Sequence, residues 1–127
     1  MLTDTERGLI AGILMSEGSF GGDGKQPHVM LRKHIRHESL MRWLVARFPR
    51  SRLYGPYHHG DRSYFQWVAR GPALLEDVLP VLEELVVPEL DAHAAARLRA
   101  MRERYGTYIA RSQAREGRSE PKGGRSR

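Results

Sequence analysis

The 127-residue sequence contains no cysteine, so it offers neither a disulfide framework nor a cysteine-based zinc site. No apolar run approaches the roughly 18 residues that a membrane-spanning helix needs. The first residues also lack a basic segment followed by an apolar stretch, which is the pattern of a secretory signal. We therefore expect one soluble domain with a modest core and no membrane partner, located in the cytoplasm and associated with the nucleoid if the source is bacterial.

Carboxylates are scarce in the middle of the chain. Residues 21–70 hold ten Lys or Arg against three Asp or Glu, and residues 111–127 hold six against two. Residues 1–20 and 71–110 are net acidic, and the whole chain carries +6. Positive charge concentrated in this way is typical of a protein that binds a polyanion such as nucleic acid. A solvated basic surface would have the same composition.

An apolar helix is predicted near the N-terminus. Residues 3–6 form a Thr-Asp-Thr-Glu capping box that starts it, and Gly18 ends it. Its expected buried stripe consists of Leu9, Ile10, Ile13 and Leu14.

Glu17 lies at the C-terminal end of this helix, where the helix dipole is negative and a carboxylate is unfavourable. A divalent cation would compensate for that charge, and the alternative is an ordinary helix end with a glycine cap. Small residues at helical spacing would let another backbone approach closely; these are Gly8, Ala11 and Gly12.

Alternating polarity predicts a strand over residues 28–35, with Val29, Leu31 and Ile35 toward the core. Residues 52–70 read as a hairpin that turns at residues 59–61, with Phe65 and Trp67 inward. Helices are expected over residues 38–48, from residue 72 with a kink at Pro80, and from Pro88 to about Tyr108.

The order α-β-β-α-β-β-α predicts an α+β fold with a curved four-stranded antiparallel sheet and helices on one face. We expect residues 1–108 to form the domain. Residues 109–127 are almost free of apolar side chains, so they are expected to form a basic disordered tail, either a loose phosphate tether or merely solvated.

Residues 9–20, LIAGILMSEGSF, resemble the signature helix of the LAGLIDADG homing endonucleases. Ala11, Gly12, Glu17 and Gly18 match the motif, and Met15 stands where the family has its first acidic residue. The order and polarity of the later segments extend the resemblance over roughly residues 5–105. The motif occurs once, as in the single-motif, homodimeric members of that family.

The resemblance implies a metal-dependent endonuclease for double-stranded DNA with a nearly palindromic site. It implies that Glu17 and Gly18 hold Mg²⁺ or Mn²⁺, and that Lys33 or His34 orients water or metal. Family members carry a lysine near the start of the last helix, whereas residues 88–91 here contain none. Two helices would meet through Gly8, Ala11, Gly12 and Met15.

One face of the predicted sheet is polar and basic, and such a face can lie in the major groove, where Arg and Gln read base edges in pairs. The candidate DNA-binding residues are Lys25, His28, Met30, Arg32, Arg52, Tyr54, Arg62, Tyr64 and Gln66. Trp43 and Trp67 are interpreted as core residues, while Tyr54 and Tyr64 could stack on bases or serve only as surface residues.

Histidines offer weaker signals, since His58, His59 and Asp61 could bind a metal but are more typical of a solvated turn. His34 and His37 could also bind a metal, but they need not converge at a strand-to-helix junction, so solvated side chains are again favoured. Three functions follow: a homodimeric Mg²⁺-dependent endonuclease, a non-cleaving DNA-binding regulator on the same sheet, and an RNA-binding protein. A wide sheet suits the DNA major groove better than the narrow groove of A-form RNA, so RNA binding is the least favoured.

Overall fold

The computed structural model describes residues 1–125, with the side chains of residues 1–115. The predicted order of helices and strands is confirmed, and the sheet is four-stranded and antiparallel throughout. The elements are α1 (Asp4–Glu17), β1 (Ser19–Gly22), β2 (Pro27–His34), the 3₁₀ turn η1 (Ile35–His37), α2 (Glu38–Arg47), β3 (Arg52–His59), β4 (Arg62–Arg70), the π-helical segment η2 (Ala73–Val78), α3 (Leu79–Leu85), α4 (Ala92–Arg104) and α5 (Gly106–Arg125).

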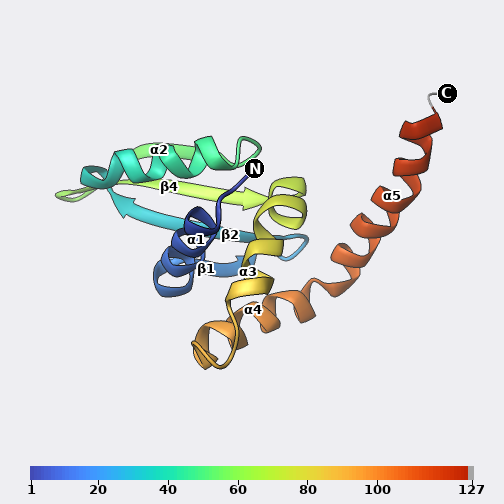
Figure 1. Cartoon of the computed structure of the whole chain (residues 1–127). Helices are drawn as coiled ribbons and strands as arrows, with labels where there is room; N and C mark the ends of the chain where they lie inside the picture. Colours follow the sequence, from blue (N-terminus) through green and yellow to red (C-terminus); the bar gives the residue numbers. More distant parts are fainter. Residues whose placement is uncertain (126–127) are drawn as a thin grey trace.

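The strands lie in the order β1-β2-β4-β3, and the helices pack on one side of this curved sheet (Figure 1). Val29, Leu31, Phe65 and Trp67 point to that side and are almost completely buried, as predicted from the alternation. The Trp67 indole Nε1 donates to Ser51 Oγ at 2.8 Å, which satisfies its one polar atom inside the core. The opposite side, which we call the open face, carries His28, Met30, Arg32, His34, Arg52, Tyr54, Tyr57, His59, Arg62, Tyr64, Gln66 and Arg70.

The capping box at the start of α1 is confirmed, because Glu6 N donates to Thr3 Oγ1 and Thr3 N donates to Glu6 Oε1. The buried face of the helix is rotated from the predicted stripe, however. Leu9 is 49% exposed, and the residues buried beneath the helix are Ile10, Ala11 and Leu14.

Three predicted boundaries differ from the structure. Ile35, expected in the core, lies in η1 and is 38% exposed, because β2 ends one residue earlier. Pro80 lacks the N–H that an α-helix needs, and the helix changes from π to α geometry just before it. The helix expected from Pro88 begins at Ala92, where Asp91 Oδ1 accepts a hydrogen bond from Ala94 N at 2.9 Å.

A β-bulge interrupts β3. Tyr54 lies opposite Gln66 and Tyr57 lies opposite Tyr64, so three steps along β3 match two steps along β4. Side chains beyond the bulge therefore change face, and Tyr57 joins Tyr64 on the open face.

The segment predicted to be disordered from residue 109 is helical in the structure as far as Arg125, and residues 126 and 127 lie outside the described part. Ile109 is buried and the Tyr108 hydroxyl donates to Gln26 Oε1 at 3.2 Å, which anchors the start of α5. Beyond this anchor α5 leads away from the body of the molecule (Figure 1). Over residues 110–115, alanine, arginine and glutamine favour a helix without any apolar contact, so low hydropathy alone did not exclude one there. Across residues 1–125, none of the helices combines the length and the apolar character required to cross a lipid bilayer.

Candidate nucleic-acid interface

Glu17 lies at the edge of the open face. Its carboxylate borders a cavity of about 220 Å³ whose other walls are Ser19, Met30, Arg32 and Gln66. Arg32 and Gln66 are directly opposite each other on β2 and β4, and Arg32 Nη2 donates to Gln66 Oε1 at 3.1 Å. The carboxylate predicted to act in chemistry therefore shares one hollow with two side chains predicted to read bases.

Lys33 projects from β2 toward the helical side and reaches the end of α1. Its Nζ lies 2.8 Å from Glu17 Oε1. Glu17 is half exposed, so this ion pair contributes at most about 1 kcal/mol to stability. His34 points to the other side of the strand, where its Nδ1 accepts from Arg36 N at 3.0 Å. Glu17 and Lys33 are thus brought together, and His34 is separated from them by the alternation of the strand.

Arg97 on α4 is a residue of this region that the sequence did not reveal. Its guanidinium donates through Nη1 to Gly18 O and through Nη2 to Met15 O, both at 3.0 Å, and it lies 4.9 Å from the centre of the Phe20 ring. A fixed positive charge at the last carbonyl groups of α1 opposes the negative end of the helix dipole. At the end of the helix axis, the chain itself therefore supplies a positive charge, while a divalent cation at the Glu17 carboxylate stays a prediction.

We predict that Arg97→Ala lowers the free energy of unfolding by about 2 kcal/mol, because two charge-assisted hydrogen bonds are lost and two carbonyl groups are left without a donor. Denaturant unfolding measures the change. Arg99→Ala is the matched control, since Arg99 is exposed on the same helix and the change should be within about 0.5 kcal/mol. Equal stability of the two variants would contradict this role of Arg97.

The donors available to a metal in one protomer are few. Among the described residues no group of three His, Asp or Glu side chains converges. The Gly18 carbonyl, expected as a ligand, accepts from Arg97, and Glu17 pairs with Lys33. Magnesium binds well to one or two carboxylates completed by water and phosphate oxygens. Glu17 fits such a site only when other oxygens come from a second protomer or from a phosphodiester.

The centre of the open face is an arginine–aromatic cluster. The Arg32 guanidinium lies 4.8 Å from the centre of the Tyr64 ring, and the Tyr57 and Tyr64 rings are 5.5 Å apart. Tyr57 was not predicted here, because the bulge that turns it toward Tyr64 leaves no mark in the alternation. Burial and the nearby Arg70 lower the pKa of His28, which favours the neutral imidazole, a form that can both donate and accept.

The remaining candidates are spread more widely. Arg52 and Tyr54 are exposed on β3, at the edge of the sheet. Lys25 lies in the β1–β2 turn, next to Gly24, whose N–H donates to Tyr105 Oη at the helical side. The structure therefore does not bring Lys25 together with the other basic residues of the open face. His58 Nδ1 and Ser63 Oγ are 2.7 Å apart, which ties His58 into the hairpin.

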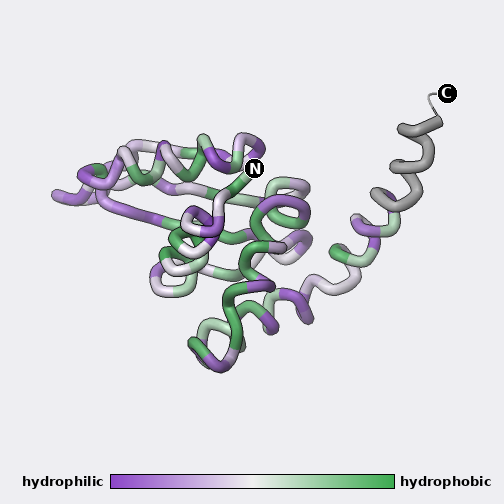
Figure 2. The backbone as a smooth tube through the Cα atoms, in the orientation of Figure 1, coloured by the Kyte–Doolittle hydropathy of each residue, from purple (hydrophilic) through white to green (hydrophobic). Residues whose placement is uncertain are grey.

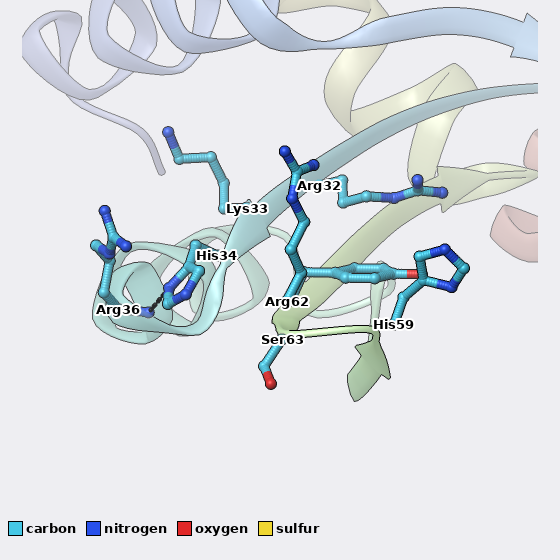
Figure 3. Close-up of a pocket in the computed structure, with 8 residues that line it drawn as sticks. Arg32, Lys33, His34, Arg36, His59, Arg62 and Ser63 are labelled. Carbon is cyan, nitrogen blue, oxygen red and sulfur yellow. Dashed lines mark hydrogen bonds between the residues drawn. The ribbon is translucent and has the colours of Figure 1, made fainter.

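A groove of about 590 Å³ opens where β2 meets η1 and the β3–β4 hairpin turns, and we call it the basic groove (Figure 3). Figure 2 shows hydrophilic residues gathered at this end of the sheet. The groove is lined by Arg32, Lys33, His34, Arg36, His59, Arg62, Ser63 and Tyr64.

One side of α1 is uncovered. A Cβ atom added at Gly8 or Gly12 would meet no atom within 4 Å, and Leu9 beside them is 49% exposed. Ala11, expected on the same small-residue side, is instead buried in the protomer's own core, and Met15 is partly buried against it. The surface available to a second copy of α1 is therefore centred on Gly8 and Gly12.

Comparison with known proteins places the fold. No protein-family model and no curated protein sequence matches the chain. Among solved structures, it is similar to the group I intron-encoded homing endonuclease I-CeuI in complex with DNA, with a TM-score of 0.61 and 16% identity over 81% of this chain and 55% of that one. It is also similar to a lysine-to-alanine mutant of I-SmaMI, with a TM-score of 0.56 and 11% identity over 81% of this chain and 45% of that one. The chain spans about half the length of these proteins and shares their α+β fold.

Proposed function

We propose that this chain binds a nearly palindromic site in double-stranded DNA as a homodimer and cleaves both strands with a divalent metal ion, Mg²⁺ or Mn²⁺. The observation that carries the proposal is the cavity shared by Glu17, Arg32 and Gln66. A base-reading pair and a carboxylate that open into one hollow would place a phosphodiester beside the acid while the bases are read. The structural similarity to a homing endonuclease in complex with DNA supports the same assignment.

The uncovered side of α1 supports the dimer. A single protomer has one Glu17, which cannot act on both DNA strands. Two chains related by a two-fold axis supply two such carboxylates, one for each strand. Packing α1 on its twin through Gly8 and Gly12 brings the ends of the two helices, and both Glu17 side chains, to the centre of the two sheets. A metal held there by Glu17 and phosphate oxygens would stabilise the attacking and leaving oxygens of phosphodiester hydrolysis.

A second function is a DNA-binding regulator that does not cut. It is favoured by the Glu17–Lys33 ion pair, which already neutralises the carboxylate that lines the cavity among the described residues, and by Met15 in place of the first acidic residue of the motif. Both functions use the same open face, so they differ only in chemistry.

The deciding experiment is selection of binding sites from random duplex DNA, followed by incubation of the selected duplex with Mg²⁺ or Mn²⁺. A nearly palindromic consensus that is then cut on both strands supports the endonuclease. Tight binding without any cleavage supports the regulator. Absence of a consensus would contradict both.

We predict that Gln66→Ala relaxes base preference at one position in each half-site, because its amide is held toward the cavity by Arg32. The loss of discrimination should be about 1–3 kcal/mol at that position, with little change in the salt dependence of binding. Repeating the selection with the variant measures it, and Gln113→Ala on α5 is the control. An unchanged consensus would show that Gln66 does not read bases.

A further inference from the structure

The arginines that form described ion pairs lie on the helical side of the molecule, although Arg99 and Arg104 on that side are not among them. On the helical side, five of them pair with carboxylates: Arg7 with Glu84, Arg42 with Glu38, Arg47 with Glu6, Arg50 with Glu76 and Asp77, and Arg102 with Glu83. On the sheet and the segment that follows β2, the described ion pairs include none of Arg32, Arg36, Arg52, Arg62 and Arg70. The sheet side therefore keeps charge that an external anion can use.

The cationic side chains of the basic groove differ in whether another group of the protein already binds them. Lys33 is paired with Glu17, and Arg32 is held by Gln66 and Tyr64. Arg36 and Arg62 are exposed, and neither takes part in an ion pair of the described residues. Glu38, the carboxylate nearest to Arg36 in the sequence, bonds Arg42 instead. These two guanidinium groups are thus the cations that the groove offers to a ligand.

The composition of the groove favours phosphate over a base edge. In the part of the chain that the structure describes, four cationic side chains, two histidines, a serine and a tyrosine line it, and no carboxylate does. Reading a base requires fixed donor–acceptor pairs such as Arg32 with Gln66, whereas a phosphodiester needs only positive charge and donors. Figure 3 shows Arg36 and Arg62 on different elements around the groove, so a chain of phosphates can run between them.

The groove also adjoins the cavity at Glu17. Arg32 lines both, and Lys33 reaches from the groove to the Glu17 carboxylate. A strand with one phosphate beside Glu17 would therefore have its next phosphates in the basic groove.

We propose that the basic groove holds the sugar–phosphate backbone of double-stranded DNA next to the phosphate at Glu17, with Arg36 and Arg62 as its phosphate contacts. This proposal rests on the proposed function; it gives Arg62, already a candidate of the open face, a phosphate contact, and it adds Arg36, which the alternating face does not select. Arg36 lies outside the sheet, and its part in the groove depends on η1 folding back beside β2.

The test is the salt dependence of binding to the selected duplex and to a mixed-sequence duplex. Because each substitution is present in both protomers of the dimer, Arg36→Ala and Arg62→Ala should each reduce the slope of log K against log salt by about 2, and the double variant by about 4, on both duplexes. The selected consensus should not change. Arg99→Ala removes the same charge from the helical side and should leave the slope as it is.

The outcomes separate this proposal from the proposed function. If wild type binds no duplex, the proposed function fails. If wild type binds and the two groove variants keep its slope, only the phosphate assignment is overturned. A changed consensus in either variant would show base contact and overturn it too. Equal or tighter binding of an RNA duplex that the same variants abolish would also overturn it in favour of RNA.

Discussion

Glu17→Gln is expected to lower the rate of DNA cleavage by at least about a hundredfold while duplex binding persists or becomes slightly tighter. The amide keeps the shape of the side chain but removes the charge that would hold a metal beside the phosphate, a contribution of several kcal/mol. Binding does not weaken, because a negative charge next to the DNA backbone is lost and Lys33 is released from its ion pair. Nicking and double-strand cleavage of the selected duplex, measured with Mg²⁺ and with Mn²⁺, give the rate.

Glu103→Gln is the control for this variant, because Glu103 is an exposed carboxylate on α4 whose loss should leave cleavage unchanged. Full activity of Glu17→Gln would place the chemistry elsewhere on the molecule. A wild-type protein that binds but never cuts would leave the regulator as the function, and the same variant should then bind as well as wild type.

Gly12→Leu is expected to stabilise the isolated protomer and to abolish tight DNA binding. A Cβ atom added at this position meets no atom beyond its own helix backbone within 4 Å, and replacing a helical glycine gains up to about 1 kcal/mol of helix propensity. On a paired helix, the same side chain would hold the two backbones apart. A protomer that binds its half-site alone loses the avidity of the dimer, and the affinity for DNA falls by a factor of about 10²–10⁴. Sedimentation equilibrium with and without duplex reports the assembly, and thermal unfolding reports the protomer.

Ala100→Leu is the control, because it adds a side chain of the same size at an exposed position of α4. It should change neither assembly nor affinity. A Gly12→Leu protein that remains dimeric on DNA would rule out α1 as the dimer contact, and Glu17 would then no longer be expected at a two-fold axis.

Local patterns in the sequence predicted most of the fold. The capping box fixed the start of α1, and alternation identified the buried side of β2 and β4 through Val29, Leu31 and Phe65. These features are set by neighbours one to four residues apart, so the sequence displays them directly. The family resemblance named Glu17 and Lys33 as parts of one site, but their ion pair was not predicted.

Contacts between distant segments could not be predicted. Arg97 lies 79 residues after Gly18, and nothing around it distinguishes it from the other arginines of α4. Ala11 looked equivalent to Gly8 and Gly12 because helical spacing alone does not say which side of a helix its own sheet covers. The helix after residue 106 depends on backbone propensity and on the Tyr108 and Ile109 anchor, whereas composition emphasised the lack of apolar residues.

The extra residue in β3 sets the bend of the hairpin tip. Removing one residue between Tyr54 and Tyr57 would put two steps along β3 opposite two steps along β4, so the bulge would disappear while Tyr57 and His59 stayed on the open face. Because a bulge bends its strand and increases the local twist, the deletion would change the angle at which the tip leaves the sheet. Variation in length at this point therefore gives an engineer a way to re-aim the tip without exchanging the side chains that it presents.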